Sequence, residues 1–302
     1  MVDLSVKIGK LRLKNPVMAA SGTFGEVYGE LVDISALGAY VAKTITFNAR
    51  QGNPAPRVCE TPSGMLNSIG LENRGVEYFI KERLAGIRKY KVPIIVSVAG
   101  ESAEEFASII KRLERERIDA YELNLSCPNV KHGRHIGLIA QDDSAIKTIV
   151  KKVRRVTKRT MIAKLSPNVT DITLMAKAAE DSGADALLVA NTFVGMSINI
   201  DTKRPRLGNV VGGLSGPAIR PIALRMVYQA RKVVSIPIIG CGGIMNYKDA
   251  LEFIIAGASA VQVGTANFVN PKATEEIITG LERYLKKEKA GIKDIIGSIR
   301  TA

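Results

Sequence analysis

Short apolar runs rich in β-branched residues recur along the chain, and segments with helical spacing separate them. A helical segment between successive strands is typical of βα units, and strands covered on both faces are uninterrupted apolar runs. The runs predict eight strands, at residues 17–20, 40–43, 93–98, 120–123, 161–164, 186–190, 237–240 and 260–263. Eight βα repeats in 302 residues predict a (β/α)8 TIM barrel, with an open doubly wound sheet as the alternative. No G-x-G-x-x-G motif opens a helix after the first strand, which disfavours that alternative.

Signals for helix ends support the barrel. Ser102 followed by Glu105 predicts a capping box, and Pro217 is expected to open a helix. Residues 171–182 are expected to form a helix that ends before a glycine. A Gly-Ala pair precedes three of the strands, and its glycine is predicted to be a left-handed helix C-cap at Gly38, Gly183 and Gly257.

Two long segments interrupt the βα rhythm, residues 45–75 and residues 191–216. Both are rich in Gly, Pro and Asn, so we expect loops or hairpins over the C-terminal mouth of the barrel, where binding loops are found. We expect residues 1–302 to form a single domain that carries these insertions.

The composition, with 46% hydrophobic residues, is that of a globular protein. No apolar run approaches the roughly 20 residues of a membrane span, and residues 1–14 lack the apolar core of a signal peptide. Three scattered cysteines, Cys59, Cys127 and Cys241, fit a reducing compartment and exclude a disulfide framework or a self-contained four-cysteine iron–sulfur site. We therefore expect a cytoplasmic protein without a membrane anchor or a metal site.

The formal net charge of +14 raises the question of nucleic acid binding. Most Lys and Arg residues lie in helix-like segments such as 147–159 and 283–289, interleaved with apolar positions, which favours solvated helix faces over an RNA-binding stripe. A basic surface also suits a small anionic substrate or an acidic partner. We expect no nucleic acid partner, although charge alone does not choose among these.

Polar residues and glycines follow almost every predicted strand, at the barrel end that carries active sites. They are Ser21, Gly22, Lys43, Thr44, Ser97, Asn124, Lys164, Asn191, Thr192, Cys241, Gly242, Gly243, Gly264 and Thr265. The two lysines would be costly at the ends of apolar strands unless each met an anion or an acceptor. The glycines after the last two strands could be tight turns, but they stand where barrels commonly hold a phosphate. We therefore expect a phosphorylated cofactor or substrate.

The sequence Asn-Leu-Ser-Cys-Pro-Asn at residues 124–129 follows the fourth predicted strand. Pro128 biases Cys127 towards an extended conformation, and the basic residues of segment 131–135 could favour its thiolate. Cys127 is thus the leading candidate for a catalytic base. The competing interpretation is a buried, inert cysteine, which is the commoner state of a free cysteine.

Taken in order, these segments resemble the dihydroorotate dehydrogenases, and within them the class 1B catalytic subunits. The most specific are residues 124–129 together with the Asn-Ser-Ile-Gly-Leu sequence of residues 67–71. The resemblance covers almost the whole chain, and it extends to residues 14–18, 20–25, 43–46, 52–57, 60–62, 64–71, 190–192, 213–217, 240–243 and 263–266.

The resemblance implies an FMN-containing barrel that oxidises (S)-dihydroorotate to orotate in de novo pyrimidine synthesis. Cys127 and Lys43 would be the catalytic residues. Cys127 would remove the C5 proton while a hydride passes from C6 to the flavin, and Lys43 would meet the anionic substrate near the flavin. The substrate would be held by Lys43, Asn67, Ser68, Ile69, Gly70, Leu71, Asn124, Asn191 and Thr192. FMN would be held by Ser21, Lys43, Thr44, Ser97, Asn124, Lys164, Ala190, Gly216, Gly242, Gly243, Gly264 and Thr265, with Lys164 stabilising negative charge on the reduced ring.

The class within the family sets the electron acceptor. The membrane-associated class uses Ser at the base position and carries an N-terminal extension, and we expect neither in this chain, where Cys127 stands at the base position. Segments 52–57 and 60–62 resemble class 1B rather than the partner-free class 1A. Class 1B implies a homodimer with two electron-transfer subunits that carry FAD and a [2Fe–2S] cluster and reduce NAD. This chain has too few cysteines for the cluster and no dinucleotide fingerprint, so the partner would carry both.

Two positions depart from the family pattern. Ser97 stands where an asparagine is expected to contact the flavin, and residues 130–135 lack the paired glycines of the family's mobile catalytic loop. Two other functions compete with the first. A flavin barrel that acts on tRNA would suit the charge but would want an extra helical RNA-binding domain, and a non-redox barrel would only bind a phosphorylated ligand.

Overall fold

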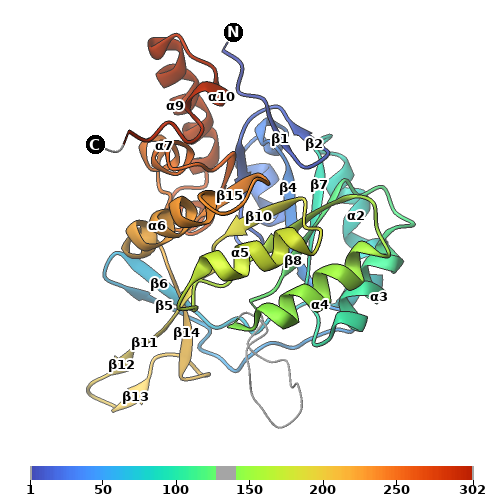
Figure 1. Cartoon of the computed structure of the whole chain (residues 1–302). Helices are drawn as coiled ribbons and strands as arrows, with labels where there is room; N and C mark the ends of the chain where they lie inside the picture. Colours follow the sequence, from blue (N-terminus) through green and yellow to red (C-terminus); the bar gives the residue numbers. More distant parts are fainter. Residues whose placement is uncertain (1, 127–140, 301–302) are drawn as a thin grey trace.

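The computed structural model of the protein describes residues 2–126 and 141–300. Eight parallel strands form its central sheet (Figure 1). They are β3 (Val17–Ala19), β4 (Tyr40–Ile45), β7 (Ile94–Val98), β8 (Ala120–Asn124), β9 (Thr160–Lys164), β10 (Ala186–Val189), β15 (Ile238–Cys241) and β16 (Ala260–Val263). Most of their residues are buried, because helices cover one face of the sheet and the barrel interior lies on the other. Each predicted strand overlaps an observed one.

The sheet closes on itself between its first and second strands. Hydrogen-bonded neighbours follow the order β4-β7-β8-β9-β10-β15-β16-β3. Met18 and Ala39 then form a parallel bridge, and the Gly38 N–H donates to the Val17 carbonyl oxygen at 2.9 Å. The predicted (β/α)8 barrel is therefore confirmed.

Helices surround the sheet on its outer face (Figure 1). They are α1 (Gly75–Tyr78), α2 (Leu84–Arg88), α3 (Ala103–Leu113), α4 (Asp143–Arg154), α5 (Ile172–Asp181), α6 (Arg220–Arg231), α7 (Tyr247–Ile255), α8 (Ala266–Val269), α9 (Ala273–Glu288) and α10 (Ile292–Ile295). In α3 the buried residues Phe106, Ile109, Ile110 and Leu113 have the spacing of one helix face. None of the described helices is both long and apolar enough to cross a membrane.

The predicted helix ends are mostly confirmed. The Ser102 hydroxyl accepts the Glu105 N–H at 3.2 Å, but the Glu105 carboxylate caps the Glu101 N–H, so the box is offset by one residue. Pro217 opens a short 3₁₀ turn, η5 (Pro217–Ile219), that leads into α6. Asp171 caps α5, which ends before Gly183 as expected.

Two of the three predicted C-cap glycines have left-handed backbone, Gly183 with φ +101° and Gly257 with φ +121°. The prediction for Gly38 is wrong, because its φ is not in the left-handed region. A Cβ at Gly38 would lie 2.3 Å from the Asn15 carbonyl oxygen. Glycine is needed there for the close approach of two backbone segments at the seam of the barrel.

The two long insertions pair with each other over the barrel mouth. Strands β5 (Val58–Thr61) and β6 (Gly64–Asn67) come from the first, and β11 (Phe193–Met196) and β14 (Val211–Ser215) come from the second. They form one antiparallel sheet in the order β11-β14-β6-β5. The chain between β11 and β14 forms a separate small hairpin, β12 (Ile198–Asn199) and β13 (Arg204–Pro205). The expected hairpins over the mouth are therefore present.

A second hairpin, β1 (Val6–Ile8) and β2 (Leu11–Leu13), lies at the opposite end of the molecule in Figure 1. Its inward residues, such as Ile8 and Leu13, are buried. The Lys10 N–H in its turn donates to the hydroxyl of Thr160, the first residue of β9. The hairpin therefore packs at the amino ends of the strands, away from the mouth.

Candidate functional site

A row of hydroxyl groups crosses the barrel at the carboxyl ends of its first strands. The Ser21 hydroxyl lies 3.1 Å from the Thr44 hydroxyl and donates to the Ala42 carbonyl oxygen. The Thr44 hydroxyl lies 2.9 Å from the hydroxyl of Ser97, which is fully buried. Three of the predicted flavin-binding residues thus belong to one hydrogen-bonded row.

The row ends on Glu122, a carboxylate with 0% exposure at the centre of β8. Glu122 accepts hydrogen bonds from the Ser97 hydroxyl at 3.0 Å and from the Gln262 Nε2 at 2.8 Å. Its Oε1 also lies 3.6 Å from the Nζ of Lys164, which is itself buried at the end of β9. Glu122 therefore gives the buried ammonium group its counterion.

Glu122 and Gln262 were not predicted as site residues. Both lie within apolar strand runs, and their only signal in the sequence is a polar side chain where the neighbours are apolar. A buried charge needs a partner. The prediction of Lys164 at the end of the next strand therefore indicates that an acidic residue such as Glu122 lies nearby.

Lys43 lies at the mouth beside the turn that follows β3. A Cβ at Gly22, whose φ is +82°, would come within 3.2 Å of the Lys43 side chain. Although solvent reaches the side chain, partial removal from bulk water lowers the pKa of Lys43. The charge of Lys164 lowers it further, while Glu72 acts in the opposite direction. The Lys164 charge therefore reaches Lys43, and two lysines at one barrel mouth make the mouth suited to an anion.

Cys241, at the end of β15, faces the same pair of charges. Burial raises the pKa of its thiol to about 11, while Lys164 lowers it and Glu122 raises it. The thiol is therefore protonated at neutral pH and is not a base. The adjacent Ala190, predicted to touch the flavin, is buried, and its N–H donates to the Cys241 carbonyl oxygen at 3.0 Å.

Side-chain amides gather on the other side of the mouth. The Asn191 Nδ2 donates to the Asn124 Oδ1 at 3.4 Å, which joins the ends of β10 and β8. The Asn67 Nδ2 donates to the Gly213 carbonyl oxygen at 3.3 Å, and a Cβ at Gly213 would lie 2.0 Å from the Thr192 hydroxyl. The pairing of β14 with β6 thus brings Asn67 towards Thr192, 125 positions along the chain.

Asn168, which was not predicted, steadies this group. Its Nδ2 donates to the Thr192 carbonyl oxygen at 3.2 Å, and its Oδ1 accepts the Val194 N–H at 2.9 Å. An asparagine in a polar loop after β9 carries no sequence signal that separates it from other turn residues.

The turn after β6 contains the other predicted substrate residues, Ser68, Ile69, Gly70 and Leu71. The Ser68 hydroxyl accepts the Asn53 Nδ2 at 2.8 Å, and the Ile69 carbonyl oxygen accepts the Asn53 N–H at 3.2 Å. Gly70 and Leu71 have φ of +71° and +57°. Both line a cavity of about 850 Å³ with Arg50 and Asn53. Ser68 and Ile69 do not line that cavity.

Glycines shape the ends of β14, β15 and β16. Gly216, Gly242 and Gly243 have φ of +99°, +133° and +72°. A Cβ at Gly264 would have no neighbour closer than 3.7 Å, so space adjoins this glycine. The Thr265 hydroxyl donates to the Ser215 hydroxyl at 2.8 Å, which joins the eighth strand end to β14.

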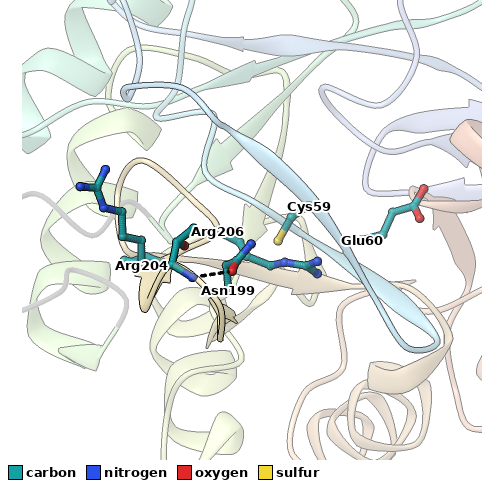
Figure 2. Close-up of a pocket in the computed structure, with 7 residues that line it drawn as sticks. Cys59, Glu60, Asn199, Arg204 and Arg206 are labelled. Atoms are coloured by element: carbon teal, nitrogen blue, oxygen red, sulfur yellow. Dashed lines mark hydrogen bonds between the residues drawn. The ribbon is translucent and has the colours of Figure 1, made fainter.

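A second cavity, of about 590 Å³, shares no lining residue with the first. Figure 2 shows the residues that line it. It is lined by Cys59 and Glu60 of β5 and by Asn199, Arg204 and Arg206 of the β12–β13 region. None of the predicted site residues lines it. Across the described ranges, no cluster of three His, Cys, Asp or Glu side chains could hold a metal ion. Cys127, the predicted base, lies outside the described residues.

The family model described as "Dihydroorotate dehydrogenase" matches residues 3–285 of the chain. A protein of Thermoanaerobacter pseudethanolicus named "Dihydroorotate dehydrogenase B (NAD(+)), catalytic subunit" is 54% identical over 302 residues, which cover 99% of both chains. Proteins of the same name from Bacteroides thetaiotaomicron and Caldicellulosiruptor bescii are 51% and 52% identical, again over 99% of each chain. With this likeness along its whole length, the chain belongs to the dihydroorotate dehydrogenase family.

Proposed function

We propose that this chain is the catalytic subunit of a class 1B dihydroorotate dehydrogenase, which oxidises (S)-dihydroorotate to orotate with NAD as the final acceptor. The observation that carries the proposal is the full-length likeness to relatives named as B (NAD(+)) catalytic subunits. The two lysines and the amides at one barrel mouth support it, because the substrate is a cyclic amide that bears a carboxylate. The reaction belongs to de novo pyrimidine synthesis.

The residues at the mouth fit FMN as the resident cofactor. The backbone N–H groups of Gly243, Gly264 and Thr265 donate no hydrogen bond to another described residue, so they are available to a phosphate. Space adjoins Gly264, and the buried ammonium of Lys164 lies deeper in the barrel. We infer that these amides would hold the phosphate and that Ser21, Thr44, Ser97, Ala190 and Lys164 would hold the ring.

Bound FMN would supply the two-electron acceptor for the hydride from C6 of the substrate. In our proposal Cys127 takes the C5 proton, since a carbon acid beside a carbonyl needs a positioned base. The Lys43 ammonium binds the substrate carboxylate. Asn67, Asn124, Asn191 and Thr192 orient the pyrimidine ring through hydrogen bonds. Lys164, held by Glu122, balances the negative charge that develops as the reaction proceeds.

The electrons must then leave the chain. The names of the relatives call them subunits, so those proteins work with another chain. We infer that the partner of this chain carries FAD and a [2Fe–2S] cluster, and that two copies of each chain form a heterotetramer. We also infer that residues 1–302 act as one FMN-binding domain in the cytoplasm.

Anaerobic absorbance spectra test the proposal. We expect the purified chain to show an oxidised flavin band that dihydroorotate bleaches, and we expect NAD to be reduced only when the partner subunit is added. A flavin band that dihydroorotate leaves unchanged would contradict the proposed substrate. NAD reduction by the isolated chain would contradict the assignment of FAD and the cluster to a partner.

A further inference from the structure

Three large apolar side chains are exposed in two segments of the chain. Leu31 directly follows the 3₁₀ turn η1 (Glu26–Glu30), and Phe268 and Val269 lie in α8, just after β16. Leu31 is 55% exposed, Phe268 52% and Val269 72%. We call them the η1–α8 patch. Side chains of this size, left exposed together, mark interaction surfaces more often than isolated exposed residues do.

Hydrogen bonds join the two segments that carry the patch. The Tyr28 hydroxyl donates to the Asn267 carbonyl oxygen at 3.2 Å, and the Asp33 N–H donates to the Glu275 carboxylate at 2.6 Å. Leu31 lies between these two ties in sequence, and Phe268 and Val269 follow directly after Asn267. The two segments that carry the patch therefore lie side by side, although they are distant in the sequence.

The patch adjoins the proposed flavin site. The buried Asn267 donates from its Nδ2 to the Thr23 hydroxyl at 3.2 Å and to the Val263 carbonyl oxygen at 2.9 Å. Its own N–H donates to the carbonyl oxygen of Gly264, one of the glycines assigned to FMN. Phe268 follows Asn267, which bonds to Gly264, so a protein bound to the patch would lie beside the proposed flavin phosphate site.

Charge on this surface is opposite to that of the whole chain. Segments 28–33 and 266–276 contain four acidic residues and one lysine, in a chain whose net charge is +14. Glu30 and Asp33 flank Leu31, and Glu275 and Glu276 lie at the start of α9. None of the four carboxylates forms an ion pair with a described residue. Asp33, Glu275 and Glu276 each accept a hydrogen bond from within the chain, at 2.9, 2.6 and 2.9 Å, but these donors are neutral and leave the negative charges unbalanced. The surface is therefore suited to basic groups of another molecule.

We propose that the η1–α8 patch is the docking surface for the electron-transfer subunit, which would meet it with apolar residues surrounded by Lys and Arg. The proposal rests on the proposed function, because only an electron-transfer partner needs to lie next to the flavin. A second copy of this chain would have no such need.

The test compares two exposed apolar residues. Val269→Glu places a charge in the patch, and Leu174→Glu places one on α5 at a residue that is 61% exposed. Each FMN-loaded variant is titrated calorimetrically with the FAD- and [2Fe–2S]-containing subunit. We expect Val269→Glu to weaken binding about tenfold or more and Leu174→Glu to change it by less than about twofold. Flavin content and the mass of the catalytic subunit alone, measured by light scattering, should stay unchanged in both.

Three outcomes would overturn the proposal: wild-type affinity in Val269→Glu, loss of self-association in that variant, or no binding of the subunit by the wild-type chain. The second would identify the patch as a contact between copies of this chain. Bleaching of the flavin by dihydroorotate is measured without the partner, so it tests the proposed function separately. Normal bleaching with normal docking of Val269→Glu would remove only the docking proposal.

A charge reversal tests the chemistry of the partner. Glu30→Lys removes one exposed carboxylate beside Leu31, and Glu282→Lys on α9 is the matched control. We expect Glu30→Lys alone to slow association and to reduce its dependence on ionic strength. An unchanged association rate would contradict a basic partner face.

Discussion

The buried pair of Glu122 and Lys164 allows a prediction whose size follows from the structure. Glu122→Gln keeps the shape of the side chain but removes its charge. The hydrogen bond between positions 122 and 262 can survive this change. The Gln262 Oε1 has no partner among the described residues, so after rotation of the Gln262 amide it can accept from the new amide at position 122. What is lost is the attraction between Glu122 and the Lys164 ammonium at 3.6 Å.

Two estimates of that loss agree. Coulomb's law with an effective dielectric constant of about 20 gives roughly 4–5 kcal/mol at this separation. Removing one partner of a buried ion pair typically costs about 3–5 kcal/mol, because the other charge is left uncompensated. We therefore expect Glu122→Gln to lower the free energy of unfolding by about 3 kcal/mol or more, measured by urea denaturation of the FMN-free protein.

A double-mutant cycle with Lys164→Gln isolates the pair. The double variant should be more stable than Glu122→Gln alone, because no unpaired charge then remains buried. Glu104→Gln, which breaks an exposed ion pair with Lys152, should cost less than about 1 kcal/mol. A loss below about 1 kcal/mol in Glu122→Gln, or additive effects in the cycle, would refute the view that Glu122 neutralises Lys164.

Other predictions concern the substrate, the base and pH. Lys43→Ala should raise the dissociation constant for orotate, and an unaltered constant in a fluorescence titration would count against that contact. Cys127→Ala should keep its flavin band but lose most turnover, and stopped-flow bleaching at the wild-type rate would remove Cys127 from the mechanism. Burial alone would raise the pKa of Glu180, but hydrogen bonds from Ser235, Lys177 and Ile236 outweigh it and lower the value from 4.5 to about 2. Because the folded-state pKa is lowered, this stabilisation is present above pH 4.5 and is lost as the pH falls towards about 2. Glu180→Gln should cost at most about 3 kcal/mol at pH 7 and flatten the stability profile in that range, and an unchanged acid unfolding midpoint would contradict this.

The strands of the barrel could be predicted because each is buried on both faces and therefore appears as an apolar run. The residues at the carboxyl ends of the strands could then be predicted to share one face, because the barrel topology places all of these ends together. The sequence alone therefore predicts that Lys43, Lys164 and Asn124 share one mouth. The hairpin β1–β2 was missed, although Val6, Ile8, Leu11 and Leu13 alternate with polar residues. Three residues per strand give too short a pattern.

Three glycines show which structural roles the local sequence can and cannot predict. At Gly183 and Gly257 the preceding helical pattern identifies the cap, and the observed positive φ agrees. Gly38 stands in the same Gly-Ala pair but is required by the Asn15 backbone, which passes against it. Asn15 precedes Gly38 by 23 positions, so the contact depends on how the barrel closes. The residues around each glycine therefore do not show whether it caps a helix or allows two backbone segments to approach.

Long-range pairing limited the prediction of the site in the same way. The sequence indicates hairpins over the mouth, but the register in which Asn67 lies opposite Gly213 depends on the pairing of β6 with β14, two strands from separate insertions. That pairing decides that Asn67 points towards Thr192. Glu122 is hidden for a different reason: it occupies an apolar run that already predicts a strand correctly. Only the requirement that a buried lysine have a counterion distinguishes it, and that requirement becomes visible once the barrel places β8 beside β9.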